Sequence, residues 1–376
     1  MKRIGIYGGS FDPVHIDHVN ICKEFFALLN LDKIFVVPAR LSPFKRSSAA
    51  SAEDRFNMLR LAFKDLPFAE ISRFELDSKA TNYSYLTVEH FAELYPDANI
   101  YFLIGGDSLN TFYSWKNPQR IASLSTVCVA ARHNENTTDA AAEFFNKYGY
   151  KPVNVPFEGF CSSTVAREYI AFGLDVTDIL PPEAYDYIEQ KGLYAPDFYH
   201  EFLKEHSKPS RLIHTVGVET TARRYAEQTG CDCKKAMFAA LLHDSAKYLK
   251  AEDFPDFVPP EKLPEPIVHQ FLGAYVAEHI LGVTDADVLN AVKWHTTGRP
   301  QMTLLEKIIY TADLLEPNRT FPGVELLREA VDNDFESGFK LCVHELYKFL
   351  AESGGEVYYM SKLTDEYYNP EFYSNN

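Results

Sequence analysis

A run of glycine, aspartate and histidine residues follows the first apolar segment of the chain. Residues 8–18 read GGSFDPVHIDH. Glycines permit close backbone approach and unusual φ angles, and Asp12 and Pro13 suit the cap and first turn of a helix. His15 and His18 then share one face of that turn, where unpaired N–H groups and the helix dipole favour anions. The sequence therefore predicts a phosphate site at this turn.

A second group of ionisable residues lies in segments of helical pattern in the C-terminal half. Its members are His214, His243, Asp244, His269, His295 and Asp313. The pair His243-Asp244 ends an apolar run, where ionisable groups are costly unless they are paired or bound to metal. Imidazole with carboxylate suits Fe, Mn and similar divalent ions, and no set of thiolates accompanies them, which disfavours structural zinc. Any one of these histidines alone would be read as a paired core residue, but together they predict a metal site.

The elements that carry the first motif alternate between strand and helix. The predicted strands are Lys2–Tyr7, Lys33–Pro38, Glu70–Leu76, Asn99–Ile104 and Thr126–Ala131, and the predicted helices are Val19–Leu29, Glu53–Leu66 and Thr87–Tyr95. Helical segments show apolar residues three and four apart, and strand segments show short apolar runs. This order predicts a Rossmann-like α/β domain with a parallel sheet, in which ligands gather at the carboxyl ends of the strands.

The second half changes character, because strand patterns vanish from about Phe198 onward. The polar segment Ala195–Ser210 contains two prolines and is the natural boundary. We therefore expect an α/β domain over residues 1–197 and an all-α domain over 198–355. Residues 356–376 form a tyrosine-rich tail to which the sequence assigns no role.

Composition limits the classes of protein and partner. The chain has 376 residues and a net charge of −16, which argues against nucleic acid as a partner. Its apolar runs are too short for a membrane helix, which needs about 20 residues, and its first residues lack the apolar core of a signal peptide. Six scattered cysteines suggest the reducing cytoplasm. The oligomeric state stays open.

The first motif resembles the GxFDPxHxGH run of the nucleotidyltransferase superfamily. Two further segments, Phe102–Leu109 with Trp115 and Cys161–Arg167, resemble those of nicotinate mononucleotide adenylyltransferases, and the resemblance extends over about residues 1–195. It implies in-line attack of the mononucleotide phosphate on the α-phosphate of ATP, with Mg²⁺ bridging the phosphates. Asp17 stands where the family has glycine. Its negative charge could weaken nucleotide binding, or its side chain could point outward without any effect.

The resemblance also implies which residues act. His15 and His18 would contact the ATP phosphates and are the catalytic candidates. The candidate nucleotide-binding residues are Gly8, Gly9, Ser10, Phe11, Lys45, Gly105, Asp107, Trp115, Ser163, Thr164 and Arg167. Ser163 and Thr164 would hold phosphate oxygens at a helix N-terminus, Arg167 would add a permanent cation, and Trp115 would stack on the pyridine ring.

The second group of residues resembles the ligand order of HD-domain metal-dependent phosphohydrolases. Residues 239–247, 294–295 and 312–319 are similar to bacterial HD hydrolases that cleave diadenosine tetraphosphate symmetrically, over about residues 205–350. The resemblance implies two divalent transition ions, Fe or Mn. His214, His243 and Asp313 would hold one ion, His269 and His295 the other, and Asp244 both, with catalytic roles for Asp244 and Lys247. Arg319 is a further candidate for binding phosphate.

Several alternatives remain open from the sequence. The first domain could be another adenylyl- or cytidylyltransferase, such as the pantetheine-phosphate enzyme, and its preference between acid and amide pyridine rings is undecided. The second could be a different nucleotidase, a cyclic-nucleotide phosphodiesterase, or a non-catalytic module that senses nucleotides and regulates the transferase.

Overall fold

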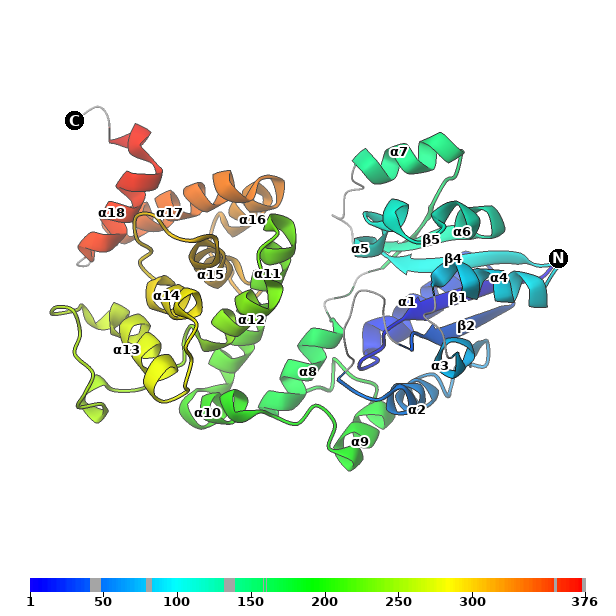
Figure 1. Cartoon of the computed structure of the whole chain (residues 1–376), viewed down its shortest axis with the longest axis horizontal. Coiled ribbons are helices and arrows are strands. Elements are labelled where there is room, and N and C mark those ends of the chain that lie inside the picture. Colours follow the sequence, from blue (N-terminus) through cyan, green and yellow to red (C-terminus); the bar gives the residue numbers. More distant parts are fainter. Residues whose placement is uncertain are drawn as a thin grey trace. The chain divides into compact units, whose positions relative to one another are not determined.

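The computed structural model describes residues 1–40, 49–78, 83–131, 139–157, 159, 161–354 and 357–373. The chain forms two compact units (Figure 1). The first contains Met1–Ile170 and Asp175–Ala195, and the second contains Ala171–Leu174 and the chain from Pro196 onward. None of the helices in the described ranges is both long and apolar enough to cross a membrane.

The first unit is built on a six-stranded parallel sheet with the order β3-β2-β1-β4-β5-β6. Its strands are β1 (Arg3–Gly9), β2 (Lys33–Pro38), β3 (Ala69–Ile71), β4 (Asn99–Gly105), β5 (Thr126–Ala131) and β6 (Val153–Pro156). The strand order reverses between β1 and β4, which lie side by side in Figure 1. Ligands of such sheets bind outside the carboxyl ends of the strands at this reversal.

Helices cover both faces of the sheet. They are α1 (Ile16–Leu28), α2 (Ala52–Ala62), α3 (Phe74–Asp77), α4 (Ser84–Leu94), α5 (Gly106–Leu109), η1 (Phe112–Ser114), α6 (Pro118–Leu124), α7 (Asp139–Tyr148), α8 (Ser163–Phe172) and α9 (Pro182–Lys191). Tyr7 packs in one core cluster with Phe25 of α1, while Ile6 packs in another with Phe91 of α4. The strands are apolar on both sides because each face is buried, as is usual for parallel sheets.

The structure confirms the predicted parallel α/β architecture and corrects one strand. Of the segment Glu70–Leu76, only the beginning belongs to β3, and Phe74–Asp77 forms the short helix α3 instead. The Phe74 ring stacks on His90 of α4 at 4.0 Å, a contact between two segments that the local sequence pattern does not show. The elements α7 and β6 were not predicted.

The described residues of the second unit form helices joined by turns and loops, and none of them forms a strand. Its elements are α10 (Phe198–His206), α11 (Pro209–Thr229), α12 (Cys233–Leu242), η2 (Ala251–Asp253), α13 (Glu265–His279), α14 (Ala286–Trp294), α15 (Leu304–Leu315), α16 (Val324–Asn333), α17 (Phe335–Glu352), α18 (Tyr359–Tyr368) and η3 (Pro370–Phe372). The helix α12 lies against α11, α14 and α15. Its alanines Ala236, Ala239 and Ala240 are fully buried, and their small side chains let these neighbours approach closely.

The tyrosine-rich tail belongs to this helical unit. The helix α18 packs on α17, and the ring of Tyr368 meets that of Phe339 edge to face at 4.9 Å in the main core. The sequence did not reveal this packing, because only Val357, Met360 and Leu363 accompany the aromatic rings of the tail as large apolar side chains.

Candidate phosphate site and candidate metal centre

The loop after β1 is held by contacts that its sequence does not reveal. The helix α1 begins at Ile16 with His15 as its N-cap, so the expectation that Asp12 caps this helix was wrong. The Asp12 carboxylate instead accepts hydrogen bonds from the backbone N–H groups of Ala49 (2.8 Å) and Ala50 (3.0 Å) and from the Tyr194 hydroxyl (2.8 Å). These donors are far away in the sequence and outcompete the local cap.

Neither glycine of the loop has a positive φ angle, and only Gly9 makes a close approach that excludes a side chain. Gly8 and Gly9 end β1 and pair with β2, and the positive φ of the loop, 48°, belongs to Phe11. A Cβ atom on Gly9 would lie 2.8 Å from the Phe11 ring, so only glycine fits there. The buried Phe11 ring lies 4.9 Å from the His18 ring and packs beneath it.

His15 and His18 lie against each other at the start of α1. Their ring centroids are 3.6 Å apart, and the His15 backbone N–H donates to His18 Nδ1 over 3.1 Å. Burial, and then the neighbouring His15, lower the pKa of His18 well below its usual value. A neutral His18 whose Nδ1 accepts a hydrogen bond carries its proton on Nε2. It can therefore donate to a phosphate oxygen.

The N-terminal end of α8 docks on the same loop. Ser163 Oγ donates to the carbonyl of Pro13 over 2.9 Å. Arg167 donates to the carbonyl of Asp12 over 2.6 Å and to Thr164 Oγ1 over 3.1 Å. The structure thus brings together the histidine pair and the serine, threonine and arginine expected to hold phosphate. The N-terminal end of α8, which is the positive end of its dipole, and the Arg167 guanidinium therefore lie beside the start of α1.

The remaining candidates of this site come from the neighbouring strand. Gly105 ends β4, and Asp107 lies in α5, which follows directly. The Trp115 side chain is half-buried, and its ring lies 5.4 Å from that of Phe112. Lys45 lies outside the described residues. Sequence reasoning missed Arg55, which is fully buried and donates to the carbonyl of Ser10 over 2.7 Å.

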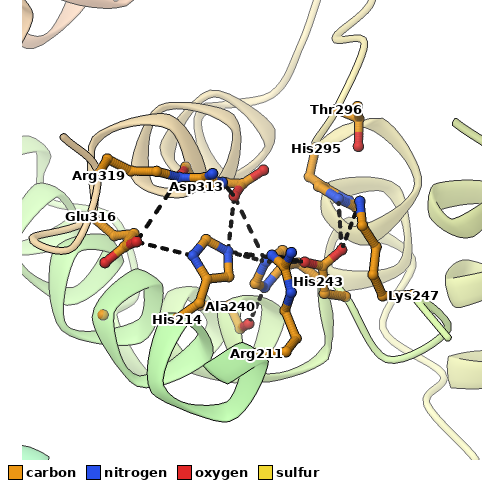
Figure 2. A network of polar contacts seen from close by, with 12 residues as sticks. Arg211, His214, Ala240, His243, Lys247, His295, Thr296, Asp313, Glu316 and Arg319 are labelled. Atoms are coloured by element: carbon orange, nitrogen blue, oxygen red, sulfur yellow. Dashed lines mark hydrogen bonds and ion pairs between the residues drawn. The ribbon is translucent and has the colours of Figure 1, made fainter. Parts of the chain in front are cut away.

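The six histidine and aspartate candidates of the second unit converge from five helices. They come from α11 (His214), the end of α12 (His243, Asp244), α13 (His269), the end of α14 (His295) and α15 (Asp313). Their ligand atoms form two groups that could each hold a metal ion, with the atoms of each group within 4.8 Å of one another. One group is His214, His243 and Asp313, and the other is Asp244, His269 and His295. Figure 2 shows most of this network.

Backbone and carboxylate oxygens fix the direction of three imidazoles. His243 Nδ1 donates to the carbonyl of Ala240 over 2.6 Å, and His295 Nδ1 donates to that of Val292 over 2.7 Å. A carbonyl only accepts, so Nε2 of each neutral ring has a free lone pair. His214 Nδ1 lies 3.1 Å from Glu316 Oε1 (Figure 2). Such partners of the second nitrogen are typical of metal-binding histidines.

The nitrogen atoms that remain face one another in pairs. His214 Nε2 lies 3.3 Å from His243 Nε2, and His269 Nε2 lies 3.2 Å from His295 Nε2. Two lone pairs at this distance repel unless a proton or a cation lies between them. In addition, Asp244 Oδ1 is buried and accepts no hydrogen bond from the part of the chain that the structure describes. Nitrogen and oxygen donors arranged in this way fit divalent transition metals.

The protonation states of Asp244, Asp313 and His269 suit metal binding, whereas His214 must lose a proton before it can bind an ion. Burial alone would raise the pKa values of Asp244 and Asp313, yet contacts with His243 and His214 hold both below the usual range. Burial, and then His295, lower the pKa of His269 to about 3. Burial opposes protonation of His214 as well, but its hydrogen bonds to Asp313 and Glu316 raise its pKa, so a positive charge is favoured there. Ionised carboxylates and neutral imidazoles are the forms that bind metals.

Three cationic side chains surround the six candidates. Arg319 Nη2 donates to Asp313 Oδ1 over 2.7 Å, and Lys247 Nζ lies 3.1 Å from His269 Nε2, so both predicted cations lie at the centre. Arg211 donates to Asp244 Oδ2 over 2.7 Å and was missed. Helical spacing could have found it, because Arg211 precedes His214 by three residues. Glu316 follows Asp313 by three residues, so the same helical spacing could have found it as well.

These features define a protein with two kinds of site. A phosphate-binding turn at the strand reversal of an α/β sheet is typical of nucleotidyltransferases, and a buried histidine and aspartate centre among helices is typical of HD domains. Residues 6–169 match the cytidylyltransferase-like family, and residues 211–318 match the HD domain family. The predicted fold class is thereby confirmed.

Similar proteins share this combination. A Mycoplasma genitalium protein named "Probable nicotinate-nucleotide adenylyltransferase/Ap4A hydrolase" is 33% identical over 85% of this chain and 88% of its own length. A symmetrical bis(5'-nucleosyl)-tetraphosphatase of Bacillus subtilis is 40% identical over 42% of this chain and 88% of its own length. A probable nicotinate-nucleotide adenylyltransferase of Endomicrobium trichonymphae is 34% identical over 52% of this chain and its whole length. The chain therefore belongs to the family of two-domain proteins that join a cytidylyltransferase-like domain to an HD domain.

Proposed function

We propose that the chain is a bifunctional enzyme. Its first unit transfers the adenylyl group of ATP to nicotinate mononucleotide, giving deamido-NAD and pyrophosphate. Its second unit hydrolyses diadenosine tetraphosphate (Ap4A) symmetrically to two ADP. The observation that carries the proposal is the pair of three-ligand groups in the second unit, together with the histidine pair and α8 at the sheet reversal of the first.

In the transfer reaction, an oxygen of the mononucleotide phosphate bonds to the α-phosphorus of ATP, and the bond from this phosphorus to the bridging oxygen breaks. Catalysis of this kind is mostly positioning and stabilisation of charge. His18 donates from Nε2 to an α-phosphate oxygen, and His15 contacts the neighbouring phosphates. The N-terminal N–H groups of α8 and the Arg167 guanidinium stabilise the negative charge. Mg²⁺ bound with ATP supplies further neutralisation of charge.

In the hydrolytic reaction, water attacks a phosphorus in the middle of the tetraphosphate, and one ADP leaves. Two divalent ions would supply Lewis-acid chemistry and activation of water there, held by the two groups with Asp244 between them. Lys247, Arg211 and Arg319 then neutralise the phosphate oxygens. Each of the three lies within hydrogen-bonding distance of a candidate ligand, which supports a role close to the substrate.

The finer assignments belong to the same proposal. Transfer lies in residues 1–197 and hydrolysis in residues 198–355, with Lys45 and the Trp115 ring at the nucleotide site. The HD ions are iron or manganese, and the enzyme works in the cytoplasm on small nucleotides. The acid form of the pyridine nucleotide is the preferred acceptor.

The convergence of all six candidates supports catalysis over a purely sensing role for the second unit. The variant Asp244→Ala separates the two. A catalytic centre loses Ap4A hydrolysis and leaves transfer unchanged, whereas a sensing module changes the response of transfer to added nucleotide.

One experiment tests the proposal as a whole. The full chain is incubated separately with ATP plus nicotinate mononucleotide, with ATP plus the amide mononucleotide, and with Ap4A, and the products are identified by chromatography. The proposal expects deamido-NAD from the first mixture, less product from the second, and ADP alone from the third. ATP and AMP from Ap4A, or no product from the first mixture, would contradict it.

A further inference from the structure

The C-terminal helix contacts the segment that follows a candidate metal ligand. Residues 295–303 join α14 to α15 and begin with His295. The Tyr368 hydroxyl of α18 accepts a hydrogen bond from the Met302 backbone N–H over 2.7 Å. The Thr364 hydroxyl lies 3.2 Å from the carbonyl of Thr297 and 2.7 Å from that of Met360, and shares its proton between them.

The approach of α18 to this segment is close. Gly298 has a φ of +63°, and a Cβ atom placed on it would lie 2.8 Å from the Thr364 methyl carbon. Thr364 is fully buried. Glycine thus supplies both the left-handed backbone and the space that α18 needs.

The opposite side of the segment is held from α13. Gln270 directly follows the candidate ligand His269 and is fully buried. Its Oε1 accepts hydrogen bonds from the backbone N–H groups of Thr296 and Thr297, both over 3.2 Å, and its Nε2 donates to Thr297 Oγ1 over 3.1 Å. Thr296, labelled in Figure 2, lies with its hydroxyl 3.2 Å from His269 Nε2.

A buried carboxylate anchors α18 in turn. Asp365 is fully buried. It lies 3.1 Å from His344 Nδ1 of α17 and accepts hydrogen bonds from Asn369 Nδ2 (2.8 Å) and the Tyr373 hydroxyl (2.5 Å). Asn369 also donates to the carbonyl of Lys340 over 3.0 Å. The helix is therefore fixed on α17, and it can act as a rigid support for its other neighbours.

We infer that Tyr368 and Gln270 are positioning residues of the metal centre and that α18 is a working part of it. Together they fix the segment after His295, and this segment, with the hydrogen bond from His295 Nδ1 to the Val292 carbonyl, sets where the His295 ring presents Nε2 beside Asp244 and His269. The inference rests on the proposed function, because it assumes that these three residues bind a metal ion. The other group, His214, His243 and Asp313, is carried by α11, α12 and α15.

The test compares Tyr368→Phe with Tyr367→Phe in the full chain. Tyr368 is 7% exposed and its neighbour Tyr367 is 49% exposed, so both variants lose one hydroxyl but only the first loses the bond to Met302. The two affinities for Mn²⁺ are measured by titrating chelator-treated protein and recording the free ion by electron paramagnetic resonance. Circular dichroism melting of the same samples reports whether the helical unit, in which Tyr368 lies, is folded.

We expect Tyr368→Phe to bind one Mn²⁺ as the wild type does and the second about tenfold more weakly, as changes behind a metal ligand commonly do. Ap4A hydrolysis then returns at higher Mn²⁺, and Tyr367→Phe matches the wild type. Gln270→Met, which removes the acceptor from the opposite side, gives the same selective loss.

Wild-type affinity for both ions in Tyr368→Phe and Gln270→Met would overturn the inference while the proposed function stands. Equal weakening of both ions would also overturn it, because it would indicate general loosening of the unit. A wild-type chain that binds fewer than two ions would instead contradict the proposed function, and the inference with it.

Discussion

Asp17 Oδ2 accepts a hydrogen bond from the backbone N–H of Cys161 over 2.8 Å. This bond joins the first turn of α1, which carries His18, to the residues that lead into α8. Asp17 is 3% exposed, and a Cβ atom on Gly159 would lie 2.4 Å from the same carboxylate oxygen. The aspartate that replaces the glycine of the superfamily is thus built into the packing between two helix termini.

This relationship predicts that removing the Asp17 carboxylate disturbs both stability and nucleotide binding. A hydrogen bond to a charged group contributes about 1.5–3 kcal/mol, so Asp17→Ala lowers the free energy of unfolding by roughly this amount. Because α8 then shifts relative to α1, the KM for ATP rises. Asp17→Asn keeps an acceptor oxygen and retains most of both. Thermal melting and transferase kinetics measure the effects, and unchanged values in Asp17→Ala would show that the bond is unimportant.

His18→Ala should abolish most adenylyl transfer without unfolding the protein. The side chain is only half-buried, and the proposal places its Nε2–H on the α-phosphate, where loss of one donor to developing charge costs about 10²–10³ in kcat. The variant also removes the ring that lies against His15, so we expect kcat to fall by at least this factor. Ap4A hydrolysis by the same preparation is the control for the second unit, and thermal melting shows whether the first unit is folded. Near-normal transfer would remove His18 from the catalytic group.

The lowered pKa of His18 predicts sensitivity to acid. The unfolded chain binds this proton near pH 6.5, whereas the folded chain binds it only at lower pH. Stability from this group is therefore complete above about pH 6.5 and falls below it, by at most about 1.4 kcal/mol per pH unit.

We predict that calorimetric melting shows a smaller loss of stability between about pH 7.5 and 5.5 in His18→Gln than in the wild type. The exposed His279 supplies the control, since His279→Gln should keep the full loss. If His18→Gln and the wild type lose equal stability, His18 is not the group that titrates.

Glu316 is predicted to tune the first metal group through His214. Its Oε1 lies 3.1 Å from His214 Nδ1, its Oε2 accepts from the Asn318 backbone N–H over 2.7 Å, and Gly217 leaves it room, since a Cβ atom there would lie 2.4 Å from Oε2. Glu316→Gln keeps the size and loses the charge, so metal affinity at this group falls about 10-fold or more. Metal titration checks this against Glu325→Gln, an exposed control. Equal affinity in the two variants would assign Glu316 a purely structural role.

The sequence predicts those parts of the candidate sites whose residues lie close together in the chain. The turn from Gly8 to His18 and the pair His243-Asp244 are contiguous, and helical or strand periodicity placed them on elements. The sequence could not reveal partners that only the fold brings together. Asp12 bonds to a loop about 37 residues away, Gln270 of α13 holds the segment between α14 and α15, and Tyr368 of α18 holds the same segment from its other side.

The most direct test of the central claim is stepwise return of metal to the chelator-treated chain. Fe²⁺ or Mn²⁺ is added in known equivalents, and ADP formed from Ap4A is measured at each step. We predict that hydrolysis appears as the second ion binds, with ADP as the sole nucleotide product, while adenylyl transfer stays constant throughout. Full hydrolysis with one ion bound, or hydrolysis without any added ion, would contradict a two-metal centre built from His214, His243, Asp244, His269, His295 and Asp313.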